Sequence, residues 1–404
     1  MHPDGNGNWI DLAHTDFESL LPLLDPETKS TSKPSRERAI FKLYGNGVNT
    51  ARDEWVTDFS SSTLSKKVKM FLGEFSHHAP KTEVHDAVIK WSRNLKSKLD
   101  RGQREVFDVS QLRAYAYRPY VTVHGYLSRL MIDELGQLPA FDVPRNVTIN
   151  LPAGKEFRCL ATHLPSDFHY IGDTKVLGLV RSDDDGNCVD NITDWALDQF
   201  RKHYQPGRTK PKRLIIKEAI FHYVYGVLHN PVYREKYALN LKREFPRIPF
   251  YADFWQWADW GKTLMDLHIG YETVEPFKLK RIDAGSSPEP SPRKRGEGAS
   301  ERAEAPKPML KADRETGRIV LDTLTTLSGV PPDAWDYRLG NRSALEWILD
   351  QYKEKKPKDP TIREKFDTYR FADYKEKVID LLMRVTRVSV ETQAAVEAMR
   401  KAAR

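Results

Sequence analysis

Hydrophobic residues in the first quarter of the chain recur every three or four positions, which is the period of an amphipathic helix. The stretch 61–75 places Leu64, Val68 and Phe71 on one stripe. The stretch 83–99 carries a similar apolar stripe. The pattern therefore predicts two helices, each with one buried face.

The helical period returns in the middle of the chain. The run 217–230 predicts one helix, and Asn230-Pro231 then ends it and starts another over 231–245. Asn is a good N-cap residue, and Pro suits the first turn of a helix. A third helix is predicted to begin at Asp253.

Between these helical regions the pattern changes to short β-branched and aromatic runs separated by Pro, Gly and Asp-Gly. Such runs are typical of strands. Strands are predicted within 146–152, 157–165, 167–172 and 175–190, with Asp-Asp-Asp-Gly-Asn at 183–187 as a hairpin turn. This turn fails the calcium-loop pattern, since a glycine at the sixth position would put an arginine at the first, where Asp is required.

The segment 285–308 differs in composition from the rest of the chain. It contains no aromatic residue and no Val, Ile, Leu or Met. Such a composition cannot offset the entropy lost on ordering, so a disordered linker or surface insertion is predicted over 284–317. Beyond it, the stretch 317–331 suggests an edge strand or hairpin, and Ser343 with Glu346 predicts a capping box that starts a helix.

Together these elements predict an α+β fold with helix-rich N- and C-terminal parts and a mostly antiparallel sheet between them. The 404 residues include 64 basic and 57 acidic side chains, which gives a net charge of +7. A basic surface suits a polyanionic partner such as nucleic acid. Cys159 and Cys188 are the only cysteines, which excludes a disulfide framework and a cysteine-rich zinc site. No apolar run reaches the ~18–20 residues of a membrane span, and the start shows no signal-peptide pattern, so a cytoplasmic protein is expected.

Catalytic motifs are missing. The Gly-Asn-Gly sequence at 45–47 lacks a third glycine and a clean helix start, which favours a turn over a dinucleotide or S-adenosylmethionine loop. The string closest to the Asn-Pro-Pro-Tyr loop of adenine methyltransferases, at 230–237, is a helix start. Asp167, Asp173 and Lys175 match a metal-dependent nuclease site only loosely. No ATP-binding loop is present, and no catalytic residue, cofactor-binding residue or metal ligand is predicted.

Six strings occur in order along the chain: FKLYGNGVNTARDEWVTDF, YAYRPYVTVHGY, NITDWALDQFRKHY, IFHYVYGVLHNPVYREKYALNLKREFPRIPF, FWQWADWGKTLMDLHIGYE and YRLGNRSALEWILDQY. Together they resemble the C-terminal specificity region of single-chain type I (Type ISP) restriction–modification enzymes. Enzymes of this family fuse a nuclease, a helicase-like translocase, an N6-adenine methyltransferase and a target recognition domain. The resemblance implies that this chain holds the last part, with or without the trailing edge of the methyltransferase, and that its partner is double-stranded DNA. It also implies that S-adenosylmethionine, ATP and Mg serve the associated domains and that the chain itself holds no cofactor.

The resemblance and the pattern together predict four parts of the chain. Residues 1–110 form a helical segment at the methyltransferase boundary, and 111–283 form the specificity domain, with its sheet first and its helices second. Residues 284–317 are the linker or insertion. Residues 318–404 add a strand and helices that complete the specificity domain.

Candidate DNA contacts are cations that lie beside aromatic residues or on loops, because cations neutralise phosphates and Arg or Lys can read base edges. They are Arg113, Arg118, Lys210, Lys212, Arg213, Arg243 and Arg247. Arg118 has a structural alternative, as a buried arginine that braces Tyr117 and Tyr120. Arg52 and Asp53 could form a structural pair, and a phosphate contact by Arg52 stays open. Two other functions also stay open: a methyltransferase or nuclease with unrecognised motifs, and a docking domain without DNA contact.

Overall fold

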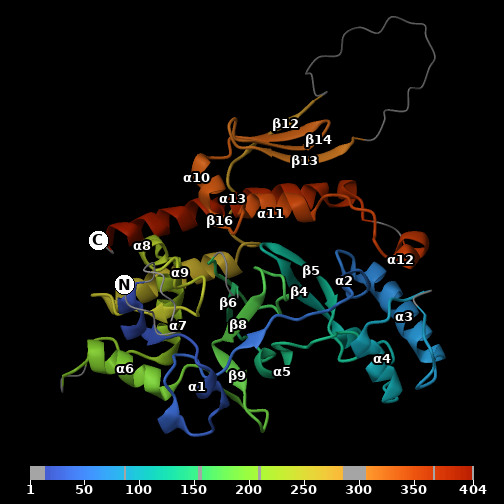
Figure 1. Cartoon of the computed structure of the whole chain (residues 1–404). Helices are drawn as coiled ribbons and strands as arrows, with labels where there is room; N and C mark the ends of the chain where they lie inside the picture. Colours follow the sequence, from blue (N-terminus) through green and yellow to red (C-terminus); the bar gives the residue numbers. More distant parts are fainter. Residues whose placement is uncertain are drawn as a thin grey trace, which may run out of the picture.

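The computed structural model describes residues 14–85, 88–152, 157–207, 211–284, 306–366 and 369–402 (Figure 1). Within these ranges the fold is α+β, and every pair of neighbouring strands in the sheets is antiparallel. The predicted fold class is confirmed.

Two small sheets form the centre of the molecule. The first has the order β3-β5-β4, and the second has the order β2-β8-β6-β7. Their strands are β2 (Gly45–Asn46), β3 (Thr57–Asp58), β4 (Leu112–Arg118), β5 (Val121–Tyr126), β6 (Thr148–Pro152), β7 (Leu160–Thr162) and β8 (Thr174–Gly178). Strands β9 (Val180–Ser182) and β10 (Cys188–Asp190) form the predicted hairpin around 183–187, and β1 (Leu21–Pro22) pairs with β11 (Arg247–Ile248). The strand predicted within 167–172 is wrong, because that stretch forms turns whose apolar residues Tyr170 and Ile171 are buried.

Helices α2 (Asp53–Val56), α3 (Ser61–His77) and α4 (Arg93–Asp100) pack beside the β3-β5-β4 sheet (Figure 1). The predicted helix over 61–75 is confirmed. The helix predicted over 83–99 is wrong in its first half, because α4 begins only after Ser92. The Ser92 hydroxyl accepts the backbone N–H of Leu95 at 3.1 Å, so this residue caps the helix. Ile89 is buried in a non-helical segment, which is why the apolar pattern extended upstream.

A second group of helices surrounds a separate apolar core. It contains α6 (Asp194–Tyr204), α7 (Lys217–His229), α8 (Pro231–Lys236) and α9 (Phe254–Ile269), and two short helices, α1 (Pro26–Ser30) and α5 (Leu138–Phe141), lie near the sheets. Asn230 caps α8 and Asp253 caps α9, as predicted. The helix predicted over 231–245 is too long, because turns follow Lys236.

The C-terminal part places a four-stranded sheet above one long helix (Figure 1). The sheet has the order β12-β15-β14-β13. The strands of this sheet are β12 (Lys280–Asp283), β13 (Pro308–Asp313), β14 (Arg318–Asp322) and β15 (Thr325–Ser328). The other elements of the C-terminal part are α10 (Pro332–Asp336), β16 (Arg338–Leu339), β17 (Arg342–Ser343), α11 (Ala344–Gln351), α12 (Pro360–Lys365) and α13 (Phe371–Ala402). The hairpin within 317–331 and the capping box of Ser343 with Glu346 are confirmed.

Most of the linker predicted over 284–317 lies outside the described residues. The predicted C-terminal boundary of this linker is wrong, because β13 lies before residue 317, pairs with β14 and buries Leu310. The division into four parts stays a prediction. Strands β2 and β3, which come from the predicted 1–110 segment, pair with β8 and β5 of the predicted specificity domain.

Candidate DNA interface

Arg113 lies on β4 and is engaged by a carboxylate from outside its strand. Its two terminal nitrogens each donate to an oxygen of Asp142 at 2.5 Å, which is the two-pronged geometry that arginine forms with carboxylates. About a third of each side chain is exposed, 34% for Arg113 and 39% for Asp142. The arginine is therefore accessible, and its hydrogen-bonding edge is already occupied.

Arg118, at the end of β4, lies deeper. Its Nη1 donates to Asp167 at 2.8 Å, and its guanidinium lies 3.9 Å from the centre of the Tyr117 ring. Burial raises the pKa of the Asp167 carboxyl, and Arg118 opposes that rise. These contacts match the bracing alternative for Tyr117. Tyr120 is not part of this cluster and instead bonds to Tyr337, 2.9 Å between the two hydroxyls.

The remaining predicted cations lie in two other parts of the chain. Lys210 falls outside the described residues, and Lys212 is exposed. Arg213 is held by α9, because it lies 3.7 Å over the Trp255 ring and donates to Asp259 at 2.9 Å. The other two are Arg243, which is exposed, and Arg247, which donates to the Glu18 carbonyl oxygen at 3.1 Å. A DNA contact by any of these residues stays a prediction.

The structure shows a basic segment, 353–365, that the sequence motifs did not predict. Its six cations are all exposed: Lys353, Lys355, Lys356, Lys358, Arg363 and Lys365. Two of its acids serve the local fold. Glu354 accepts the N–H of Phe371, and Asp359 caps α12. A count of charges in a sliding window would have found this segment, since it needs no recognisable motif.

Residues from the first part of the chain anchor this basic segment. The Trp55 indole donates to Asp359 at 2.7 Å. The Glu54 carboxylate accepts the backbone N–H groups of Lys358 and Asp359, at 2.9 and 2.8 Å. Trp55 itself is only 2% exposed. The lysine-rich segment is therefore fixed to the region that follows the Gly-Asn-Gly sequence.

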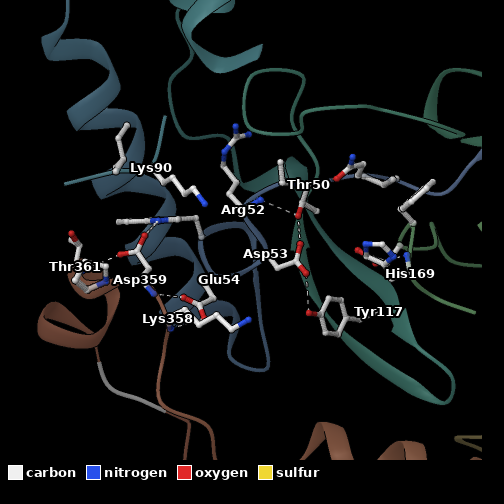
Figure 2. Close-up of a pocket in the computed structure, with 18 of the residues that line it drawn as sticks. Thr50, Arg52, Asp53, Glu54, Lys90, Tyr117, His169, Lys358, Asp359 and Thr361 are labelled. Atoms are coloured by element: carbon white, nitrogen blue, oxygen red, sulfur yellow. Dashed lines mark hydrogen bonds between the residues drawn. The ribbon is translucent and has the colours of Figure 1, made fainter. Parts of the chain in front are cut away.

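A cavity of about 650 Å³ lies where these two segments meet β4 (Figure 2). Its wall includes Asp53, which accepts the hydroxyl of Tyr117 at 2.9 Å. The predicted pair of Arg52 with Asp53 is wrong, because the buried Arg52 forms an ion pair with Asp133 at 2.9 Å. Figure 2 shows the Arg52 guanidinium turned away from Asp53.

Gly47 comes directly before Val48 of this wall and is required there for a steric reason. A Cβ at this position would lie 2.5 Å from the Asp167 carbonyl oxygen, so only glycine allows the two backbones to approach.

The three residues that loosely match a nuclease metal site, Asp167, Asp173 and Lys175, do not form one cluster in the structure. Asp167 bonds to Arg118, and Lys175 bonds to Asn46. The described residues include no group of three or more His, Cys, Asp or Glu side chains that could hold a metal ion.

The family of this chain is shown by comparison with known proteins. The Type ISP C-terminal specificity domain matches residues 39–381. The chain belongs to this family. Its role is accordingly target recognition in restriction–modification, which confirms the resemblance seen in the sequence.

Solved structures agree with this Type ISP specificity domain assignment. A cryo-EM structure of a DrdV–DNA complex is similar with a TM-score of 0.87 and 41% identity, over 98% of this chain and 40% of that chain. LlaBIII bound to DNA is similar with a TM-score of 0.78 and 22% identity, over 98% and 25% of the chains. A nuclease-deletion mutant of LlaGI with a DNA substrate mimic has a TM-score of 0.72 and 23% identity, over 98% and 30%. The last two show the fold alone.

This Type ISP specificity domain therefore spans less than half the length of these solved proteins. No curated protein matches it. In the part of the chain that the structure describes, no helix is long and apolar enough to cross a bilayer.

Proposed function

We propose that this specificity domain binds double-stranded DNA and recognises the target site of a Type ISP restriction–modification system in the cytoplasm. The nuclease, helicase-like translocase and adenine methyltransferase are proposed to belong to associated domains, which use ATP, Mg and S-adenosylmethionine. The family match supports this proposal, and so does the DNA bound in the similar DrdV structure.

The observation that carries the proposal is the arrangement of charged side chains in the basic segment 353–365. Its lysines are exposed, while two of its acids are used to hold the backbone. Exposed ammonium groups that neutralise phosphates release counterions, which supplies sequence-independent affinity. The segment is therefore the proposed phosphate-contacting surface.

Recognition of the DNA sequence requires a different kind of residue, one whose side chain forms specific hydrogen bonds with base edges. Arg113 is the best-placed candidate, because an arginine fork can bind the O6 and N7 of guanine. In the free chain this fork is bound to Asp142. To bind guanine, the Arg113 guanidinium would therefore have to release Asp142 and take the base as its partner instead.

The test compares two triple variants by fluorescence anisotropy with duplex DNA over a range of salt concentrations. The first replaces Lys353, Lys356 and Lys365 by Gln. The control replaces three exposed lysines of the C-terminal sheet region, which are Lys280, Lys307 and Lys311. The first variant should flatten the slope of log K against log salt by about 0.9 for each phosphate that is no longer neutralised. The control should leave that slope unchanged.

An unchanged slope in the first variant would remove segment 353–365 from the DNA surface. Equal flattening in both variants would show that only net charge matters. If the unaltered chain fails to bind any duplex at low salt, the docking-domain alternative replaces the proposal.

A further inference from the structure

The cavity in Figure 2 has two lysines at its rim. Lys90 and Lys358 are exposed, and among the described residues neither ammonium group takes part in an ion pair. Figure 2 shows both side chains extending toward the hollow from different walls. Two such ammonium groups facing one space favour an anion between them.

The carboxylates that line the cavity are hydrogen-bonded within the protein. Glu54 accepts two backbone N–H groups, and Asp53 accepts the hydroxyls of Thr50 and Tyr117. Asp359 accepts the Trp55 indole N–H. Their negative charge keeps an anion at the rim, whereas their remaining lone pairs can still accept bonds from a neutral ligand with N–H donors.

Aromatic rings form the opposite side of the cavity. Tyr117, Phe168 and His169 all line it, and the rings of Phe168 and His169 meet edge to face, 5.0 Å between centres. The His169 side chain is exposed, and Figure 2 shows it across the hollow from Lys90. Rings of this kind can stack on any nucleobase.

The size and the backbone of the cavity also suit a ligand. Its volume of about 650 Å³ is within the range of roughly 300–1,000 Å³ for small-ligand sites. Ala51, on its wall, has a φ of 56°, a left-handed conformation that is unfavourable for alanine. Such strain is found at functional sites more often than elsewhere.

We propose that this cavity binds one nucleotide unit, with its phosphate between Lys90 and Lys358 and its base beside His169 and Phe168. The amino group of the base faces Asp53. This inference rests on the proposed function, because the nucleotide is taken to come from nucleic acid that the chain already binds. A free nucleoside monophosphate has the same chemistry, and the experiment separates the two sources.

The first measurement is isothermal titration calorimetry of the full chain at low salt. The probes are dAMP, dCMP, dGMP, dTMP, deoxyadenosine and inorganic phosphate. At least one monophosphate should bind more tightly than phosphate or the nucleoside. The K90Q/K358Q variant should weaken that binding about tenfold or more, because it removes two charge-assisted hydrogen bonds to the phosphate. K90R/K358R should retain it, and K280Q/K311Q is the matched charge control.

The second measurement compares a paired duplex with a duplex that carries one single-nucleotide bulge. Preference for the bulge that disappears in K90Q/K358Q identifies a nucleotide of the bound DNA as the ligand. Binding of free monophosphates without that preference identifies the free nucleotide instead. If both are absent while the paired duplex still binds, the cavity proposal is overturned and DNA recognition stands. If no duplex binds either, both proposals fail.

Discussion

Replacement of Arg118 by alanine should destabilise the fold, because it leaves a buried carboxylate without its cation. The Arg118 side chain is 14% exposed and that of Asp167 is 4% exposed. Among the residues that the structure describes, Arg118 supplies one of three donors to Asp167, at 2.8 Å. The other two are the Tyr115 hydroxyl at 2.9 Å and the His169 backbone N–H at 2.8 Å.

The size of the effect follows from this geometry. Removing one partner of a buried ion pair costs about 3–5 kcal/mol. Two hydrogen bonds to Asp167 remain in Arg118→Ala, so the lower end applies and the loss should be about 3 kcal/mol. The double variant Arg118→Ala/Asp167→Asn removes the stranded charge and should recover part of that loss.

The loss should also depend on pH. Burial already raises the pKa of Asp167 above its ordinary value, and Arg118 is the largest influence that lowers it. Without Arg118 the folded-state pKa rises further above the unfolded value. The ionised carboxylate then destabilises the fold above the folded-state pKa, and protonation relieves this penalty as the pH falls toward and below it.

Urea unfolding of the variant and the unaltered chain at about pH 7.5 and about pH 5 tests both statements. The difference in unfolding free energy should be larger at the higher pH. DNA binding by the same proteins completes the test. An unchanged unfolding midpoint together with lost binding would refute the bracing role and favour direct DNA contact by Arg118.

Three further predictions concern other contacts of the fold. Trp55→Phe removes the N–H that reaches Asp359; it should cost about 1–2 kcal/mol and speed proteolysis of the basic segment, as mass spectrometry of the fragments would show. Burial lowers the pKa of His268 to about 3, so as pH falls below the ordinary histidine value only the unfolded state gains this proton. Stability should then fall by about 1.4 kcal/mol per pH unit from this group, and His268→Gln should remove that slope in urea titrations. Ser343→Ala breaks the capping box with Glu346 and should cost about 1 kcal/mol in thermal unfolding, whereas Ser343→Thr should restore most of it.

Helix starts could be predicted from the sequence because their hydrogen bonds are local. Asn230, Asp253 and Ser343 each cap a helix through backbone N–H groups two or three residues away. The failures have a different cause. Ile89 and Leu241 are buried at helical spacing but belong to non-helical segments, because the core covers them from elsewhere in the chain. Apolar spacing alone cannot separate these cases.

The candidate site depends on partners that are distant in the chain. Asp142 lies 29 residues from Arg113, and Asp167 lies 49 residues from Arg118. The bond that anchors the basic segment joins Trp55 to a residue 304 positions away. Residue type and spacing could suggest these cations, but only tertiary contacts show which of their hydrogen-bonding groups are already used.

Arginine and lysine play different parts in this fold, and the difference bears on how DNA would be held. Arg52, Arg113 and Arg118 are each joined to a carboxylate through a planar guanidinium, which suits arginine to rigid bracing. Several lysines of segment 353–365 stay exposed as point charges, which suits contacts with a phosphate chain of variable position. Affinity should therefore depend on the lysines and on salt. Discrimination between bases would require a guanidinium such as that of Arg113 to leave its carboxylate, so a change at Asp142 should alter specificity more than affinity.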